Sequence, residues 1–223
     1  MNPALESEFE ALSRSLPARV GVAIVGVGAQ TLCLGDWTGG VAWSTVKVPL
    51  AVAAARAGCA SPEQLSAAIT RSDNAAAEEL WSQLGDPAAR RVQSIVREAG
   101  DDTTTIESRR LRAEFTPFGQ TQWSLADQAR FAAGLPDVAG SSPVIDLMSD
   151  LCAEHRWGLA AKGFAAKGGW GPGLPDGYLV RQFAIVSGSI GVALAADADE
   201  YEAGVEVVDA LSTWVVDEVL AEH

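Results

Sequence analysis

The chain has 223 residues, an apolar content of 48% and a net charge of −13, from 29 acidic and 16 basic residues. This length and apolar content predict one globular domain. The acidic balance excludes nucleic acid and an anionic membrane surface as partners, because too few basic residues are present to neutralise phosphates. No apolar run reaches the roughly 18 residues that cross a bilayer, so no membrane span is expected.

The N-terminal residues 1–17 have neither the basic nor the apolar segment of a signal peptide. A complete chain would therefore be cytoplasmic, whereas a mature form could have lost its leader. The cysteines Cys33, Cys59 and Cys152 form no CxxC pair and predict neither a zinc site nor a disulfide framework. With His155 and His223 as the two histidines, neither a Ser-His-Asp triad nor a histidine metal site is expected. We expect no metal and no cofactor, and we expect His155 on the surface.

The chain opens with an amphipathic helix that stops at Pro17, and two strands over 19–28 and 30–37 follow it. A glycine turn joins these strands into a hairpin. The apolar positions that carry the first helix are Leu5, Phe9, Leu12 and Leu16.

Helices predominate in the middle of the chain, and turn residues mark where several of them begin. Ser61 and Gln64 form a capping box, and Asp86 is expected to cap another helix. Residues 101–122 have no periodicity and predict a long ordered loop. The predicted helices cover 44–58, 61–70, 75–85, 86–100, 124–135 and 142–157.

Two more strands, over 178–188 and 189–197, precede a final amphipathic helix that carries Val205, Val208, Leu211 and Val215. This order predicts an α/β fold in which strands from both ends of the chain form one antiparallel sheet. The N- and C-terminal helices would cover one face. Within the single domain 1–223, residues 1–43 and 160–223 would form the sheet part and 44–159 a helical subdomain. The cleft between the two parts is the expected place for a site.

Ser44 and Lys47 begin the first of the central helices, in the stretch WSTVKVPL. Residues three apart share a helix face, so the Lys47 amine can reach the Ser44 hydroxyl. A lysine in a desolvated cleft can lose its proton and act as the base that serine needs. Taken alone, the pair is equally consistent with a charged residue near a helix start.

Two further segments carry small polar residues and a lysine. Ser72, Asp73 and Asn74 interrupt the helices between 61 and 85 and alone would predict a turn. Lys167 precedes a glycine pair before a strand and alone would predict a flexible loop. The order S-x-x-K, S-D-N, K-x-G makes the three segments one pattern.

With these three motifs the chain resembles the penicillin-recognising serine hydrolases, most closely the class A β-lactamases. The resemblance covers nearly the whole chain, including RVGVAIV as the first strand and AKGGWGP as the third-motif strand. It implies a β-lactamase/transpeptidase-like fold with a reduced helical subdomain, because only 28 positions separate Ser44 from Ser72. It also implies a monomer and an extracytoplasmic location.

Carried over residue by residue, the resemblance makes Ser44 the acylated nucleophile, Lys47 its base and Ser72 the residue that passes a proton to the leaving nitrogen. Asn74 would hold the substrate's amide side chain, and Lys167 would attract the substrate carboxylate. Gly169 and Trp170 would belong to the substrate-binding strand. The oxyanion hole would use the backbone N–H groups of Ser44 and Trp170.

The chain departs from the family pattern at two places that bear on chemistry. Gly168 stands where a hydroxyl residue normally follows the lysine. The glutamate and asparagine that position the deacylating water in the family have no clear counterpart. Glu107 is the better candidate for the glutamate, and Glu114 is the other, although a solvated loop carboxylate is the simpler interpretation of Glu107.

These observations predict a serine hydrolase that acts on a β-lactam or a related peptidoglycan-like amide through an acyl-enzyme, with modest activity. One alternative is a penicillin-binding, D,D-peptidase-like relative that acylates but turns over slowly. The other is a catalytically silent relative that binds a peptidoglycan-like ligand or a protein.

Overall fold

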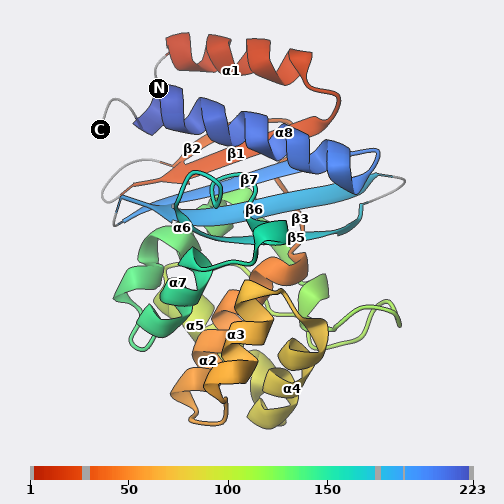
Figure 1. The fold of residues 1–223 in the computed structure, drawn as a ribbon, viewed down its shortest axis with the longest axis vertical. Coiled ribbons are helices and arrows are strands. Elements are labelled where there is room, and N and C mark those ends of the chain that lie inside the picture. The colour runs from red at the N-terminus through yellow and green to blue at the C-terminus, as the bar shows by residue number, and fades with distance from the viewer. Residues whose placement is uncertain (1–2, 27–30, 174–176, 188, 221–223) are drawn as a thin grey trace.

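The computed structural model describes residues 3–26, 31–173, 177–187 and 189–220. Its main feature is a five-stranded antiparallel sheet with the strand order β2-β1-β7-β6-β5 (Figure 1). N-terminal β1 lies between β2 and C-terminal β7, so both ends of the chain build one sheet, and this prediction is confirmed. The strands are β1 (Arg19–Val25), β2 (Leu32–Gly35), β5 (Ala165–Pro172), β6 (Tyr178–Val186) and β7 (Ile190–Ala198).

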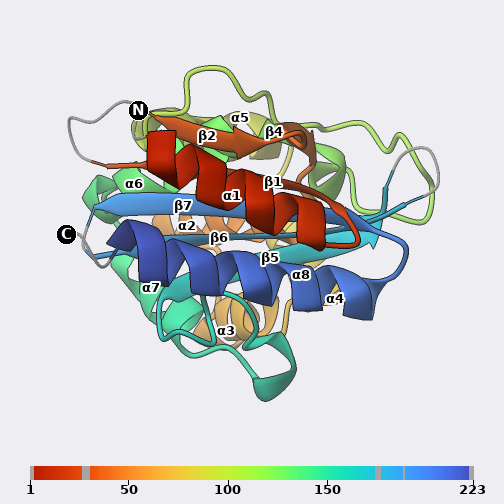
Figure 2. The same ribbon diagram turned by 90° about the horizontal axis from the view of Figure 1, so that it is seen from above.

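One face of the sheet is covered by α1 (Pro3–Ser15) and α8 (Tyr201–Trp214), which lie side by side (Figures 1 and 2). Alternate side chains of each strand point to this face. Val20, Val22 and Ile24 of β1 join the cluster beneath α1 and α8, whereas Ala23 joins the cluster on the opposite side. The terminal helices therefore cover one face, as the sequence predicts.

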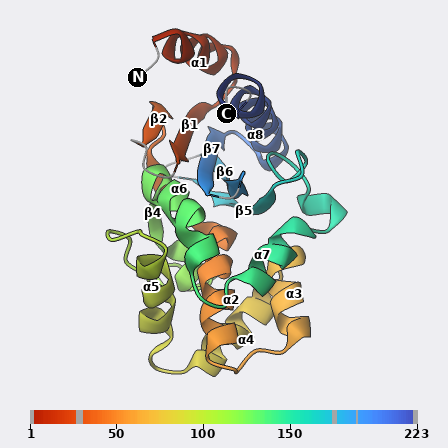
Figure 3. The same ribbon diagram turned by 90° about the vertical axis from the view of Figure 1, so that its left-hand side faces the viewer.

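The remaining helices lie on the other side of the sheet (Figure 3). Helix α6 packs directly on β1 and β7, and α2 occupies the centre of the helical block. Every residue of α2 from Lys47 to Ala54 is buried, which explains its alanine-rich sequence. The helices of this side are α2 (Lys47–Arg56), α3 (Pro62–Thr70), α4 (Asn74–Leu84), α5 (Ala88–Glu98), α6 (Leu125–Gly134) and α7 (Ser142–Ser149).

Helix boundaries follow local chemistry, with two corrections to the sequence prediction. The capping box of Ser61 and Gln64 is present. Asp86 does not cap α5, because a turn from Gly85 to Ala88 comes first and the helix begins only at Ala88. Helix α7 ends earlier than predicted, since the backbone N–H of Cys152 donates to the Thr70 carbonyl and leaves the helical path.

A two-stranded sheet of β3 (Gly39–Val41) and β4 (Gln122–Ser124) joins the sheet to the helical block. The sequence does not predict it, because three residues are too few for a periodic signal. The glycine turn expected around 27–30 and His223 lie outside the described residues. In the described part of the chain, no helix is both long and apolar enough to cross a membrane.

Candidate active site

The cleft between β5 and the helical block has a volume of about 390 Å³. Ser44, Lys47, Asn74 and Trp170 all line it, so four of the predicted site residues meet at one cavity. Its other lining residues are Trp43, Glu78, Arg110, Glu114, Phe115, Thr116, Gly119, Gly171, Pro172 and Tyr178. The cleft thus has aromatic walls and charged residues of both signs.

Ser44 lies in a tight turn between β3 and α2. A 3-10 turn spans Trp43–Val46, and α2 continues from Lys47. Trp43 has a φ of 50°, a left-handed conformation that is costly for a bulky residue. This strained residue lies directly before Ser44. The sharp turn presents the Ser44 side chain to the cleft.

Lys47 is only 1% exposed, and its ammonium contacts the second motif. The Nζ atom donates to the Ser72 carbonyl oxygen and, at 2.7 Å, to Asn74 Oδ1. Burial lowers the pKa of Lys47 to about 7, although the Asp73 carboxylate opposes part of this shift. Near neutral pH this amine is therefore divided between its charged and neutral forms.

The second motif forms a turn that directs its polar groups toward Lys47. Ser72 has a φ of 52°, in the left-handed region. Asp73 caps α4 by accepting from the Ala76 N–H at 3.0 Å. The turn predicted for these residues is present, and it places the Ser72 carbonyl and the Asn74 side chain on the same ammonium.

Lys167 contacts Ser72 as well. It is 1% exposed on β5, and its Nζ donates to Ser72 Oγ and to the Gly168 carbonyl, each at 2.9 Å. Burial, and then repulsion by Lys47, lowers the pKa of Lys167 well below its ordinary value. Lys47 Nζ lies 3.4 Å from the same Ser72 hydroxyl, so this hydroxyl joins two buried amines. In the described residues neither amine forms an ion pair.

Gly169 lets β5 pass close to the turn that carries Ser44. A Cβ atom at this position would lie 2.8 Å from the Ser44 amide nitrogen and 2.9 Å from the Ala42 carbonyl oxygen. No side chain can be accommodated there without a backbone shift, so glycine is required by contact with the turn.

Arg181 also supports the turn, although no sequence motif points to it. It is fully buried on β6, and its guanidinium donates to the carbonyls of Gly40 and Val41 just before the turn. It also bonds Gln128 Oε1 at 2.8 Å, and Gln128 Nε2 donates to Thr45 Oγ1 at 2.9 Å. A charged residue inside an apolar strand was the only signal in the sequence. The partners of Arg181 are too distant in sequence to be predicted.

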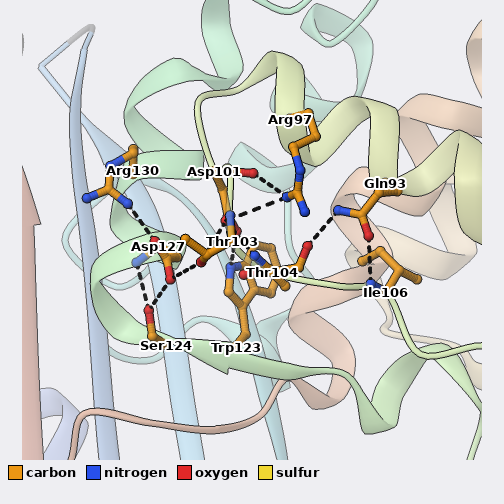
Figure 4. A network of polar contacts seen from close by, with 10 residues as sticks. All are labelled: Gln93, Arg97, Asp101, Thr103, Thr104, Ile106, Trp123, Ser124, Asp127 and Arg130. Atoms are coloured by element: carbon orange, nitrogen blue, oxygen red, sulfur yellow. Dashed lines mark hydrogen bonds and ion pairs between the residues drawn. The ribbon is translucent and has the colours of Figure 1, made fainter.

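The long loop over 101–121 supplies the remaining wall of the cleft, and a polar network anchors its start (Figure 4). Asp101 is fully buried and accepts from Trp123 Nε1 at 2.9 Å and from the Thr104 N–H at 2.9 Å. Thr103 donates to Asp127 on α6 at 2.6 Å. The loop is thereby ordered, as predicted, and its far part brings Arg110, Glu114 and Phe115 to the cleft.

Solved structures with the same architecture are class A β-lactamases. One is a variant of the class A β-lactamase of the last common ancestor of Gram-negative bacteria, with a TM-score of 0.73 and 20% identity. The match covers 99% of this chain and 100% of that one. The class A β-lactamase from Mycobacterium abscessus has a TM-score of 0.72 at 17% identity, with coverage of 97% and 99%. The chain has a class A β-lactamase-like fold.

The TLA-3 extended-spectrum β-lactamase gives a further match, with a TM-score of 0.73 at 12% identity and coverage of 97% and 100%. No protein-family model and no curated protein matches the sequence. The comparisons therefore establish the β-lactamase-like fold, whereas the chemistry depends on the side chains of the cleft.

Within the β-lactamase-like fold, Glu107 is not among the residues that line the cleft. Its carboxylate accepts from Arg109 Nη2 at 2.9 Å and from the Arg109 backbone N–H at 2.7 Å. Arg109 holds the pKa of Glu107 down at about 2, so the group is a poor base. The loop carboxylate that does line the cleft is Glu114.

Two more features distinguish this β-lactamase-like cleft. A Cβ atom at Gly168 would lie 2.5 Å from Cζ2 of Trp157, so the indole occupies the space that a side chain at position 168 would need. His155 is not a simple surface residue, which corrects the sequence prediction. Its ring is half-buried and packs against Trp170 with centroids 5.1 Å apart, and Nδ1 lies 3.3 Å from Cys152 Sγ.

Proposed function

We propose that this chain is a serine hydrolase of the β-lactamase type, which opens β-lactam or related amide bonds through an acyl-enzyme on Ser44. The observation that carries the proposal is the convergence of Lys47 and Lys167 on the Ser72 hydroxyl beside the cleft. Burying two amines without a carboxylate destabilises a fold. Such groups cluster where a reaction needs amines with lowered pKa values.

In the proposed acylation, neutral Lys47 accepts the proton of Ser44 Oγ, and the oxygen attacks the substrate carbonyl carbon. The bond between that carbon and the leaving nitrogen then breaks. Ser72 donates its proton to the nitrogen and is reprotonated by the lysine pair. The lowered pKa of Lys47, about 7, supports its role as base, because a matched pKa favours proton transfer near neutral pH.

The proposed oxyanion hole consists of the backbone N–H groups of Ser44 and Trp170. It is supported by the close approach of β5 to the Ser44 amide at Gly169. Asn74 lines the cleft beside Lys47, which suits the proposed contact with a substrate amide.

A second candidate is a penicillin-binding, D,D-peptidase-like protein that releases its acyl group slowly. The position of Glu107 favours it, because Arg109 neutralises this carboxylate away from the cleft lining. The loop carboxylate that lines the cleft is Glu114, and Phe118 stands four residues on in place of the asparagine that would fix a water, so the acyl-enzyme would accumulate. We therefore expect rapid acylation followed by slow turnover in either case.

Burst kinetics test the proposal. With a chromogenic cephalosporin or an activated p-nitrophenyl ester, the protein should release about one equivalent of product rapidly and then turn over slowly. Ser44→Ala should abolish the burst, whereas Ser15→Ala, on the exposed end of α1, should leave it unchanged. Absence of a burst and of turnover with both compounds would refute the proposal and favour a silent binding relative.

A further inference from the structure

The long loop that walls the cleft carries three arginines, and one of them lacks a carboxylate partner. Arg109 pairs with Glu107 and Arg110 pairs with Glu78, each at 2.9 Å. The Arg112 guanidinium forms no hydrogen bond and no ion pair within the described part of the chain. A cation is therefore left over on the loop.

Arg112 is nevertheless held in place at the border of the cleft. Its guanidinium lies 5.0 Å from the Trp43 ring centroid and 4.6 Å from that of Phe115, and both rings line the cavity. The Arg112 backbone N–H donates at 2.8 Å to Oε1 of Gln120, which is 3% exposed. Arg112 as a whole is half-buried, so the rings and the backbone bond fix a cation that solvent can still reach.

The contacts of Arg112 leave its hydrogen-bonding capacity unused. Aromatic rings attract a guanidinium electrostatically, but they do not replace the acceptors that its five N–H groups require. A carboxylate supplies these acceptors best, because two parallel N–H···O bonds join the two planar groups. Glu114 stands two residues away and does not pair with Arg112 in the described part of the chain, so the matching anion is not provided by the loop itself.

The position of the loop indicates which part of a substrate would meet Arg112. Arg110 pairs with Glu78 of α4, and Asn74 lies one turn before Glu78 on the same helix. Asn74, Glu78 and Phe115 of the loop all line the cleft. The loop therefore borders the same side of the cavity as Asn74, which is proposed to hold an amide in the acyl part of the substrate, the part that stays on the enzyme.

We infer, building on the proposed function, that the site selects substrates whose acyl part carries a carboxylate, bound by Arg112. On the β5 side, Lys167 offers less to a carboxylate, since it is 1% exposed and already donates to Ser72 and to the Gly168 carbonyl. Glu114 lines the cleft and opposes an anion, but its side chain is exposed, so water screens its charge more than that of half-buried Arg112.

Binding is measured first on the Ser44→Ala variant, so that it does not depend on catalysis. Two isomeric peptides, in which the scissile amide joins two glycines, carry one carboxylate at opposite ends. Glutaryl-glycylglycinamide has it in the acyl part, and (4-carbamoylbutanoyl)glycylglycine has it in the leaving part. The neutral (4-carbamoylbutanoyl)glycylglycinamide and the cationic (5-aminopentanoyl)glycylglycinamide complete the set.

Calorimetry and tryptophan fluorescence measure the four affinities. The acyl-side acid should bind about fivefold or more tightly than each of the other three peptides, because it alone can form charge-assisted hydrogen bonds with Arg112. Added salt should reduce this preference. If the acyl-side acid does not bind most tightly, the inference is overturned.

Variants in the same background assign the preference to one side chain. Arg112→Gln should bring the affinities of the two isomers close together and leave the neutral peptide bound as before, which shows that the cleft is intact. Arg112→Lys keeps the charge without the paired N–H donors and should retain only part of the preference. Arg14→Gln removes the same charge from exposed α1, on the far face of the sheet, and should change nothing. A preference that Arg112→Gln does not reduce would overturn the inference.

The p-nitrophenyl esters of glutarylglycine, (4-carbamoylbutanoyl)glycine and (5-aminopentanoyl)glycine are then tested on the wild-type protein. A Ser44-dependent burst that is fastest with the glutaryl ester supports both proposals. A Ser44-dependent burst that is no faster with the glutaryl ester overturns the substrate class and leaves the hydrolase standing. No burst with any ester, together with selective binding of the acyl-side acid, refutes the hydrolase and leaves the ligand class standing.

Discussion

Replacing Lys47 by methionine should change how the stability of the protein depends on pH. The pKa of the Lys47 ammonium falls from 10.5 to about 7 on folding, chiefly through burial. Between these two values the unfolded chain holds a proton that the folded chain has released. Unfolding then takes up a proton, so the free energy of unfolding rises with pH. Lys47→Met removes this contribution.

The size of the effect follows from the two pKa values. Between pH 7 and pH 9 the wild-type protein should gain about 2 kcal/mol of stability relative to Lys47→Met. Urea denaturation at pH 7, 8 and 9, followed by tryptophan fluorescence, measures the difference. Lys162→Met is the matched control, because it makes the same substitution at a lysine whose side chain is exposed on the surface. If the difference in the free energy of unfolding between wild type and Lys47→Met stays constant from pH 7 to pH 9, Lys47 is not a buried amine with a lowered pKa.

Three further changes test the site. Ser72→Ala removes the hydroxyl between the two amines and should slow acylation in stopped-flow assays by about 10²-fold or more, with KM little changed; an unchanged rate would exclude Ser72 from proton transfer. Gly168→Thr should lower the free energy of unfolding in urea by about 1–3 kcal/mol, because the new side chain collides with Trp157, and adding Trp157→Leu should relieve the loss. An unchanged stability of Gly168→Thr alone would show that the indole moves freely. Glu107→Gln should leave both the burst and the slow phase unchanged, because Arg109 holds this carboxylate outside the cleft lining; a reduced slow phase alone would identify Glu107 as the residual base.

Most of the fold could be predicted from local patterns. The alternation of β1 and the capping box at Ser61 each require only neighbouring residues, and both are present in the structure. The β3–β4 pair and the early end of α7 could not be predicted in this way. Both depend on backbone contacts between distant segments, such as the bond from Cys152 to Thr70.

The contacts of the candidate site could be predicted only where the residues are close in sequence. Ser44 and Lys47 are close in sequence and line one cleft, whereas the contact between Lys167 and Ser72 joins segments 95 positions apart and could not be predicted from spacing. The environment of His155 was predicted wrongly, because its contact with Trp170 joins segments that no spacing rule relates. The carboxylates of the loop were the least predictable, since an irregular backbone decides which of them faces the cleft.

The mass of the intact protein after exposure to an acylating compound tests the central claim most directly. Incubation with a penicillin and, separately, with an activated p-nitrophenyl ester should give a covalent adduct that peptide mapping places on Ser44. Ser44→Ala should remain unmodified under the same conditions. If the wild-type protein stays unmodified with both compounds at millimolar concentration over hours, Ser44 is not a nucleophile and the proposed function is contradicted.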